Sequence, residues 1–490
     1  MTQNPHPGPH LFNIGKLHDL SRRAFLRRSS QLACMGAASG YAMGLAGLSD
    51  AAAFETEGGY KALVCVFLLG GNDHANTLIP FDAPNYARYN TIRGGLPDQG
   101  GIALSQSSLA SQVLIPRDDQ VLTDDMQLAL APTMPRLKAR FDQGVMAPLL
   151  NVGPLIVPLT RQQFESGNNS SFPRPAKLFS HNDQQSTWQS GEPEGSVSGW
   201  GGRLADLAQE RNTNSMFTAI NAAGNAVFLS GDEIQPYSIA TQGAIEIAGI
   251  NRPIYGSGAT SEAVRTLLTT GNGHVFGNDY SMANARSIQF SGFINDALSN
   301  ISLSTDFGSG NSLASQLEVV ARLIAARDLI GVQRQVFLVA TGGFDNHDGL
   351  IGTHEGLLAG VDSAMDAFYR AMVEIGAADQ VTTFTASDFG RTLASNGDGS
   401  DHGWGGHHFV LGGAVDGGRF YGTAPQISVD ADDQVGRGRL LPTTSVDQYS
   451  ATLGQWLGVT PDEIPIVSPN IGNFNEPNLG FMKNAATPAT

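Results

Sequence analysis

Short apolar runs alternate along the chain with longer stretches in which apolar residues recur every three or four positions. Near-continuous apolar runs are typical of strands buried on both faces, as in a parallel sheet, and they occupy residues 61–69, 145–152, 336–340 and 381–386. Helical spacing predicts helices at residues 133–143, 312–329, 354–376 and 449–457. Because strands that alternate with helices favour parallel pairing, we predict an α/β fold with a mostly parallel central sheet flanked by helices.

The pattern is lost between residues 212 and 310. Short apolar runs in this stretch are separated by glycine, asparagine and serine, without a sustained period. A chain of 490 residues is long enough for one large domain with insertions or for two domains. We interpret residues 212–310 as an insertion or covering subdomain within one domain that spans residues 54–490.

The first 53 residues have the features of a targeting segment. The sequence SRRAFL at residues 21–26 resembles a twin-arginine export signal, an apolar stretch follows at residues 32–48, and the alanines at 51–53 fit a cleavage site. The apolar stretch is too short and too glycine-rich for a membrane span. We therefore expect the twin-arginine (Tat) machinery to export the folded protein to the periplasm or beyond. The alternative is a basic N-terminal tail with no targeting role.

Charge and cysteine content narrow the possible partners. The formal net charge is −16, whereas a broad nucleic-acid surface needs a basic footprint, so we expect no nucleic-acid partner. The negative net charge does not exclude an anionic substrate, because a bound metal ion can dominate the electric field at its own site. Once Cys34 has left with the signal, Cys65 is the lone cysteine, and no intrachain disulfide is expected.

Carboxylates and imidazoles follow the predicted strands at the points where the strands end. In chain order they are Asp73, Asp345, His347, Asp388, His402 and His407, with Asp401 and His408 next to the last two. Because open α/β sheets place ligand sites at the carboxyl ends of strands, we predict that Asp345, Asp388 and His402 converge within metal-ligand distance. Oxygen and nitrogen ligands without thiolate suit Zn²⁺, Mn²⁺ or Mg²⁺. The same side chains could instead be turn carboxylates and loop histidines that bind no metal.

A second polar stretch, LFSHNDQQSTWQ at residues 178–189, begins a helix-like run. Ser180 could be the N-cap hydroxyl of this helix. It could also be a nucleophile held at the helix N-terminus, where the dipole favours an anion. His181 follows directly, but sequence neighbourhood alone does not make a catalytic pair, and we predict no serine-protease triad.

Five motifs resemble those of a bacterial family of exported proteins known as DUF1501, in which a twin-arginine start is also typical. They are GGND (residues 70–73), LFSHNDQQ (178–185), GGFDNH (342–347), SDFGRT (387–392) and DHGWGGHHFVLGG (401–413). The resemblance implies the alkaline-phosphatase-like superfamily, which includes phosphatases, sulfatases and cofactor-independent phosphoglycerate mutases. Enzymes of that superfamily bind divalent metals through acidic and histidine ligands at strand ends.

Carried over residue by residue, the resemblance implies a role for each strand-end side chain. Asp345, His347 and His402 would bind one metal, and Asp73 and Asp388 would bind another. His407 or His408 would fill the place of a histidine that the superfamily often has where this chain has Phe389.

The resemblance also implies candidates for the chemistry. Ser180 would be the nucleophile, with Thr160 as the weaker candidate. Arg391 would hold substrate oxygens, or it would form an ordinary ion pair. We therefore expect an exported hydrolase of anionic phosphate or sulfate esters that uses one or two divalent ions (Zn, Mn, Mg or Ca). The alternative is a non-catalytic exported binding protein with a degenerate metal site.

Overall fold

Nine strands form the central sheet in the described part of the computed structural model, which comprises residues 59–483 except residues 225 and 272. Across the sheet the order is β13 (Thr444–Ser445), β4 (Met146–Gly153), β12 (Gly406–Leu411), β9 (Val381–Ser387), β1 (Lys61–Leu68), β8 (Arg334–Thr341), β5 (Ala219–Asn221), β6 (Tyr237–Ala240) and β7 (Gly243–Ala244). β12 and β7 run antiparallel to their neighbours, and the other paired strands are parallel. The predicted α/β fold with a mostly parallel sheet is therefore confirmed. The predicted export segment lies outside the described residues.

The three central strands end at the same level of the sheet. Leu68 of β1 is in register with Thr341 of β8 and with Ser387 of β9. β1 is buried along almost its whole length, as its apolar sequence requires for a strand covered on both faces. Because the strands are parallel and in register, the polar loops that follow them meet at one edge of the sheet.

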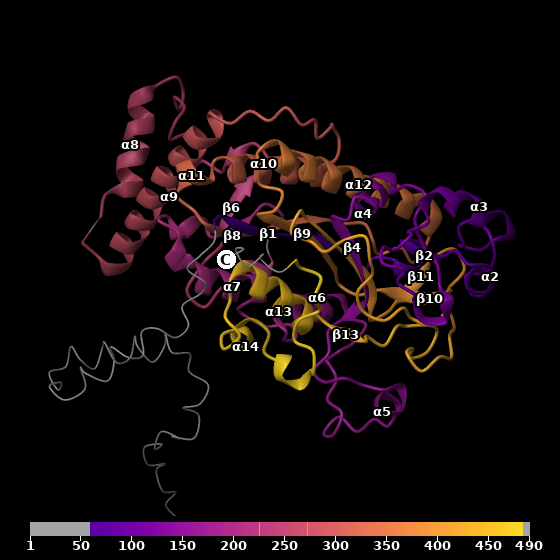
Figure 1. Ribbon diagram of the computed structural model, residues 1–490. Helices are drawn as coiled ribbons and strands as arrows, with labels where there is room; N and C mark the ends of the chain where they lie inside the picture. The colour runs from indigo at the N-terminus through magenta and orange to yellow at the C-terminus, as the bar shows by residue number, and fades with distance from the viewer. Residues whose placement is uncertain (1–58, 225, 272, 484–490) are drawn as a thin grey trace, which may run out of the picture. The chain divides into compact units, whose positions relative to one another are not determined.

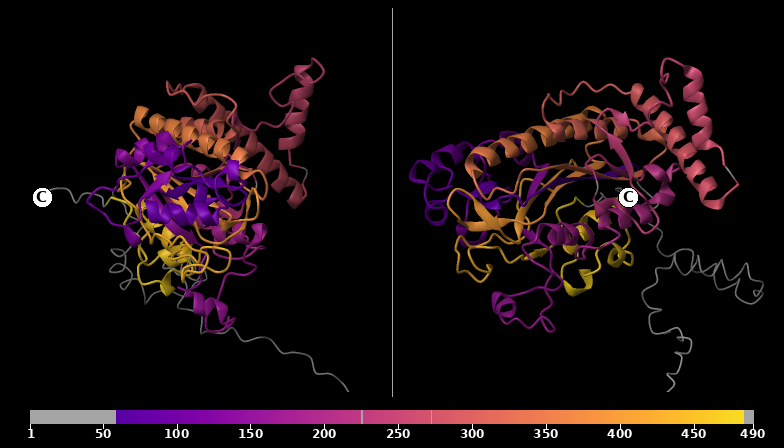
Figure 2. Two further views of the ribbon diagram at one scale, coloured as in Figure 1. Left: turned by 90° about the vertical axis from the view of Figure 1, so that its right-hand side faces the viewer. Right: turned by 180° about the vertical axis from the view of Figure 1, so that it is seen from behind.

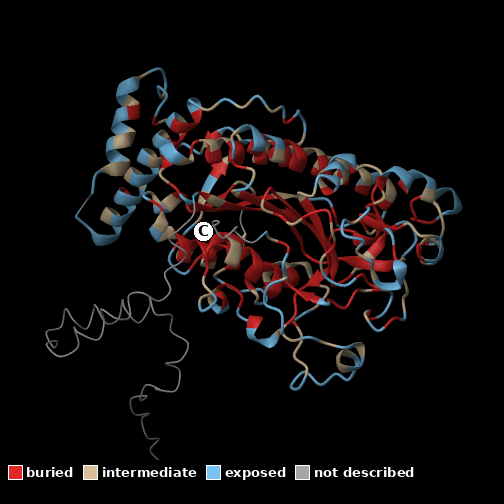
Figure 3. Ribbon diagram, in the orientation of Figure 1, coloured by how far each residue is buried: buried red, intermediate tan, exposed pale blue. Residues whose placement is uncertain are grey.

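Helices cover both faces of the sheet. α10 (Ser312–Ala325) and α12 (Leu350–Glu374) lie on one face, while α6 (His181–Ser190), α7 (Trp200–Ala208) and α13 (Val446–Leu457) lie on the other (Figures 1 and 2). The strands and the inward sides of these helices are buried (Figure 3). The remaining α-helices are α2 (Ala83–Ile92), α3 (Gln106–Leu109), α4 (Pro135–Asp142), α5 (Arg161–Glu165), α8 (Gly258–Thr269), α9 (Val275–Ser299), α11 (Arg327–Ile330) and α14 (Ile464–Val467). Within the described residues, no helix combines the length and apolar character needed to cross a bilayer.

The stretch between residues 212 and 310 contains more regular structure than its sequence pattern indicates. α8 and the 25-residue α9 lie within it. α9 buries only a few side chains, among them Ser281, Ser291 and Ile294, so it has no sustained apolar stripe that a periodicity argument could detect.

Two small antiparallel sheets complete the strands of the described chain. β2 (Leu78–Pro80) pairs with β3 (Leu128–Leu130), and β10 (Arg391–Ser395) pairs with β11 (Ser400–His402). In the second sheet Arg391 lies opposite His402. This pairing brings a buried arginine and a candidate ligand to the polar edge of the central sheet.

Candidate metal centre

The loops after β1 and β8 pack against each other with no room for a side chain between them. Gly70 has a φ of +115°, and a Cβ added there would lie 2.4 Å from the backbone nitrogen of Asp345. Phe344 N donates to the carbonyl of Leu69, at an N···O distance of 3.2 Å. A glycine at position 70 is therefore required by both the positive φ and the close approach, and it sets the position of Asp345.

The side chain of Asp345 faces three histidines that come from different parts of the chain. Its Oδ1 lies 3.2 Å from Nε2 of His347 and 3.4 Å from Nε2 of His402. Its Oδ2 lies 3.4 Å from Nε2 of His181, the first residue of α6. Ligand atoms of His181, Asp345 and His402 all lie within 4.8 Å of one another. We call His181, Asp345, His347 and His402 the open cluster.

Each imidazole of the open cluster has its other ring nitrogen beside an oxygen. His181 Nδ1 lies 2.6 Å from Asp388 Oδ2, and His402 Nδ1 lies 2.8 Å from the carbonyl oxygen of Phe179. His347 Nδ1 lies 3.5 Å from Asp401 Oδ1. A carbonyl oxygen can only accept, so His402 carries its hydrogen on Nδ1 and keeps the lone pair on Nε2. An oxygen that fixes the tautomer in this way is the usual support of a metal-binding histidine.

Two Nε2 atoms of the cluster lie within hydrogen-bond distance of each other, which requires a hydrogen on one of them or a cation between them. His347 Nε2 and His402 Nε2 are 2.9 Å apart. With Nδ1 protonated on both rings, their lone pairs would repel each other unless a proton or a metal ion were shared. Nε2 of His181 is buried and has no hydrogen-bond partner, which is a further reason to treat His181 as a candidate metal ligand.

The donor set and the separations around Asp345 fit a single divalent ion, whereas the 2.9 Å between Nε2 of His347 and Nε2 of His402 is shorter than a tetrahedral ion would leave. Bonds of about 2.0–2.2 Å to a tetrahedral ion place neighbouring ligand atoms about 3.3–3.6 Å apart, close to the distances around Asp345 Oδ1. The side chains of Asp345 and His347 are 45% and 41% exposed. The cluster is therefore open to solvent, unlike a sealed structural site, and a small molecule can reach it.

The surroundings shift the pKa values of two of the histidines in opposite directions. The hydrogen bond to Asp388 is the main cause that raises the pKa of His181 above its ordinary value. Burial is the main cause that lowers the pKa of His402. The ring of Phe389 packs against both imidazoles, with centroid distances of 4.8 and 4.7 Å, and contributes to the burial that excludes water from one side of the cluster.

Arg391 holds Asp345 through a buried set of hydrogen bonds. Its side chain is fully buried. Its Nη1 donates to Asp345 Oδ1 at 2.9 Å and to the carbonyl of Gly70 at 3.0 Å, and its Nε donates to the carbonyl of Ser400 at 3.0 Å. Burial alone would raise the pKa of Asp345, but the hydrogen bond and charge of Arg391 outweigh it and leave the pKa below its ordinary value. The predicted role of Arg391 in holding substrate oxygens is corrected accordingly, because its donors are used within the protein.

Asp388 lies behind the cluster instead of within it. Its side chain is fully buried, and Oδ2 accepts from His181 Nδ1 and from Nε2 of Gln185 at 2.8 Å. His181 thus separates Asp388 from Asp345. The predicted convergence is met by Asp345 and His402, while Asp388 supports a histidine that stands between them.

Asp73 and His407 belong to a different, buried group of side chains. Asp73 caps a turn by accepting from Ala75 N at 3.1 Å, and it forms an ion pair with Arg93 in which both side chains are fully buried. His407 Nδ1 accepts from the backbone nitrogen of Asn151 at 3.1 Å. Neither side chain reaches the open cluster, because each already has a partner in the core. Their predicted roles as metal ligands are therefore not supported by the geometry.

The two candidate nucleophiles lie at different helix starts. Ser180 precedes α6 directly, and its hydroxyl donates to Asp183 Oδ2 at 2.9 Å without accepting a cap hydrogen bond. It forms no hydrogen bond to Asp73, whose carboxylate is held by Arg93. Thr160 is exposed and caps α5 with a reciprocal bond to Gln163. Of the two, only Ser180 is adjacent in sequence to a member of the open cluster.

His181 is the functional candidate that the sequence interpretation missed as a ligand. A signal was present, because a histidine at the first position of a helix projects from that helix's N-terminal end. What could not be seen in the sequence is that this end of α6 faces the loops after β8 and β9.

A family model described as "Protein of unknown function (DUF1501)" matches residues 285–457. This segment includes Asp345, His347, Asp388 and His402 and leaves out His181. The match confirms the DUF1501 resemblance over that part of the chain. Among curated proteins, no sequence matches the chain.

Several solved structures are similar to the chain at low identity. The PsFucS1 sulfatase from Pseudoalteromonas sp. aligns over 84% of this chain and 69% of its own, with 9% identity and a TM-score of 0.34. The lipoteichoic acid synthase LtaP from Listeria monocytogenes aligns over 83% and 76%, with 9% identity and a TM-score of 0.29. The alkaline phosphatase from the Antarctic bacterium TAB5 aligns over 74% and 95%, with 8% identity and a TM-score of 0.26. At such low similarity, the site is assigned from its own geometry.

Proposed function

We propose that the protein is a metal-dependent hydrolase of phosphate or sulfate esters that acts outside the cytoplasm. The observation that carries the proposal is the convergence of three imidazole Nε2 atoms on the carboxylate of Asp345, at the edge where the central strands end. The resemblance of the sequence motifs to the DUF1501 family and its superfamily supports the choice of ester class. The exposure of Asp345 leaves the centre accessible to a substrate.

His181, Asp345, His347 and His402 would hold one divalent ion. Three nitrogen donors and one oxygen donor suit Zn²⁺ or Mn²⁺ better than Ca²⁺ or Mg²⁺, which prefer oxygen ligands. When bound, such an ion supplies Lewis-acid polarisation of an ester oxygen. The remaining parts of the site orient the ligands.

The chain's own residues prepare this centre before any substrate binds. Asp388 fixes the ring of His181, and the carbonyl of Phe179 fixes the ring of His402. Arg391 holds Asp345 and two neighbouring backbone carbonyls in one place. Ligands that are fixed in this way need little reorganisation during a reaction.

Ser180 is the nucleophile that we propose for the reaction. Its hydroxyl already donates to Asp183, so its proton has an acceptor when the oxygen forms a bond to phosphorus or sulfur and the bond to the leaving alcohol breaks. Ser180→Ala should reduce turnover by more than about 10³-fold while the bound metal remains. Full activity in this variant would assign the attack to water.

A binding protein that does not catalyse is the second candidate. The observation that favours it is the buried ion pair of Asp73 with Arg93, which removes the carboxylate after β1 from any second metal site. A centre with one ion fits catalysis and a structural role alike, so turnover separates the two candidates.

Turnover of p-nitrophenyl phosphate and p-nitrophenyl sulfate by the purified, metal-loaded protein tests the proposal. We expect hydrolysis of at least one ester by the wild type and none by His402→Ala. Equal rates in the two proteins would show that the activity comes from a contaminant or from another site. No hydrolysis of any ester in a broad panel would favour the binding protein.

Export by the twin-arginine route is part of the same proposal. Its support is the SRRAFL sequence at residues 21–26. Replacing Arg22 and Arg23 by lysine should keep the protein in the cytoplasm, as measured by fractionation and immunoblotting. Unchanged export of this variant would remove the claim without affecting the metal centre.

A further inference from the structure

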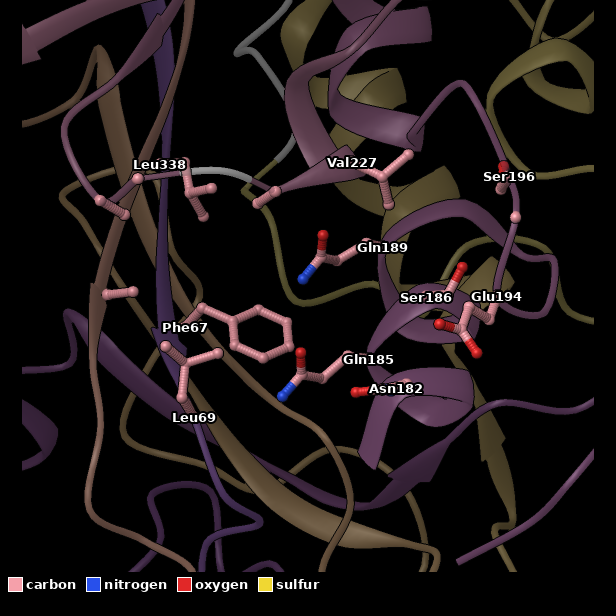
Figure 4. Close-up of a pocket in the computed structure, with 15 residues that line it drawn as sticks. Phe67, Leu69, Asn182, Gln185, Ser186, Gln189, Glu194, Ser196, Val227 and Leu338 are labelled. Atoms are coloured by element: carbon pink, nitrogen blue, oxygen red, sulfur yellow. The ribbon is translucent and has the colours of Figure 1, made fainter. Parts of the chain in front are cut away.

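A cavity of about 340 Å³ lies between α6 and the strands β1 and β8 (Figure 4). Positions 182, 185, 186 and 189 of α6 line one wall, and Phe67, Leu69 and Leu338 line the opposite wall. The spacing of three, four and seven residues places the four α6 side chains on one helix face. The cavity is at the lower end of the size range of ligand pockets, so it fits one small ring or a short chain.

Gln185 connects the cavity to the metal centre. Its Nε2 donates to Asp388 Oδ2, the same oxygen that lies 2.6 Å from His181 Nδ1. Gln185 and Asp388 therefore link the cavity to His181, a candidate metal ligand.

The polar atoms of two glutamines are fixed in opposite directions. The Nε2 of Gln185 is taken by Asp388, so its Oε1 is left to accept. The Oε1 of Gln189 accepts from the backbone nitrogen of Phe228 at 3.1 Å, so its Nε2 is left to donate. Figure 4 shows the free ends of both amides on the side of the cavity that faces Phe67. One turn of α6 thus presents an acceptor followed by a donor.

This arrangement selects for hydroxyl groups. A hydroxyl both donates and accepts, so neighbouring hydroxyls on a ring can satisfy Gln185 and Gln189 together. The buried aromatic ring of Phe67 offers an apolar surface for the opposite side of such a ring. Among the lining residues the only charged side chain is that of Glu194, which is exposed, so no cationic side chain there would hold a phosphate or sulfate.

We propose that the cavity binds the neutral polyhydroxylated ring, a sugar or a cyclitol, that carries the ester cleaved at the metal centre. That the bound ring carries an ester rests on the proposed hydrolase function, whereas the polyol site itself rests on the cavity alone. An apolar ligand would leave the two amides unpaired, and an anionic one would lack a counter-charge.

Binding of free polyols tests the cavity without any hydrolysis. The probes are glucose, galactose, mannose, fucose and myo-inositol, with cyclohexanol as the ring that lacks the extra hydroxyls, and saturation-transfer NMR on the full chain is the measurement. Gln189→Glu keeps the oxygen that accepts from Phe228 and replaces the donor by an acceptor. Gln162→Glu, at an exposed glutamine of α5, adds the same charge away from the cavity.

We expect at least one polyol, and not cyclohexanol, to bind the wild type and Gln162→Glu. Gln189→Glu should bind it about tenfold more weakly, as expected when a hydrogen bond in a built site is lost. Asn182→Ala, at an exposed position of the same wall, is the second variant should Gln189→Glu fail to fold, and it should also weaken binding. No polyol binding to the wild type, or equal binding to the cavity variants and Gln162→Glu, would overturn the inference.

A kinetic comparison separates this inference from the proposed function. Hexose 6-phosphate and 6-sulfate esters should show a KM that rises in Gln189→Glu, while the KM for p-nitrophenyl esters stays the same. Polyol binding without turnover of any ester would contradict the hydrolase and leave the polyol site standing. Turnover of p-nitrophenyl esters without polyol binding would contradict the polyol site and leave the hydrolase standing.

Discussion

Two groups of polar side chains, each containing an aspartate from a loop after a central strand, differ in how their polar atoms are satisfied. In the open cluster of His181, Asp345, His347 and His402, the histidine Nε2 atoms face one another and Asp345. A second group, which we call the closed cluster, consists of Asp73, His74, Arg93, His407 and His408, all of them buried.

The closed cluster pairs its carboxylate and one of its imidazoles with protein partners, while Nδ1 of His74 is buried without one. Asp73 is neutralised by Arg93, and His407 accepts from Asn151 N. Burial lowers the pKa of His74 to about 4 and that of His408 to about 3, so both rings are neutral at neutral pH. Residue type and strand-end position therefore do not by themselves define a metal site.

The largest expected effect is on the closed cluster. Arg93→Met leaves the carboxylate of Asp73 buried without a counter-charge, and breaking a buried pair in this way costs about 3–5 kcal/mol of unfolding free energy. The change should appear in the urea unfolding midpoint, with the metal content of the surviving folded protein unchanged.

The double variant with Asp73→Asn serves as the matched control for Arg93→Met. It removes the charge together with its partner and should lose less stability than Arg93→Met alone. If the double variant is equally unstable, the ion pair is not the cause, and packing around Arg93 would explain the loss.

A pH effect should also come from the closed cluster. His74 and His408 have folded pKa values of about 4 and about 3, below the ordinary value of 6.5, so the unfolded chain binds more protons below pH 6.5. Their contribution to stability is complete above about pH 6.5 and falls as the pH decreases toward 4 and 3. Urea unfolding between pH 7 and pH 4 should show this fall. It should be smaller in His74→Phe, and a slope that is unchanged in this variant would contradict the assignment.

A smaller effect is expected behind the open cluster. Asp388→Asn weakens the support of His181 without removing a ligand, and changes of this kind lower metal affinity about 10–100-fold. Competition with a metal-binding dye measures the affinity. The control is Asp398→Asn. The carboxylate of Asp398 accepts a hydrogen bond from Gly349 N, and the variant should bind metal as the wild type does. Equal affinity in both variants would contradict the supporting role of Asp388.

The sequence predicts the fold well because burial sets its pattern. The runs at 61–69, 336–340 and 381–386 are strands β1, β8 and β9, and the apolar stripe at 354–376 is buried on α12. α9 was missed because a helix with few buried side chains has no apolar period. A helix without a buried face can be predicted only from the intrinsic helix propensity of its residues, which is a weak signal.

The candidate site is only partly predictable from the sequence. Asp345, His347 and His402 follow strands and meet as expected. Asp73 has the same kind of position, but Arg93, twenty residues further along the chain, occupies its carboxylate. His181 joins the cluster through the docking of α6 on the sheet. Both outcomes depend on tertiary contacts that no local pattern encodes.

The central claim is that the open cluster, and not the closed one, binds a metal ion. The most direct measurement is the metal content of protein loaded with Zn²⁺ and then dialysed, by inductively coupled plasma mass spectrometry. The variants are His181→Ala and His402→Ala, and the control is His274→Ala at an exposed histidine before α9. We predict one equivalent of zinc per chain in the wild type and in His274→Ala, and far less in the other two. No zinc in the wild type, or equal zinc in all four proteins, would contradict the assignment of the site.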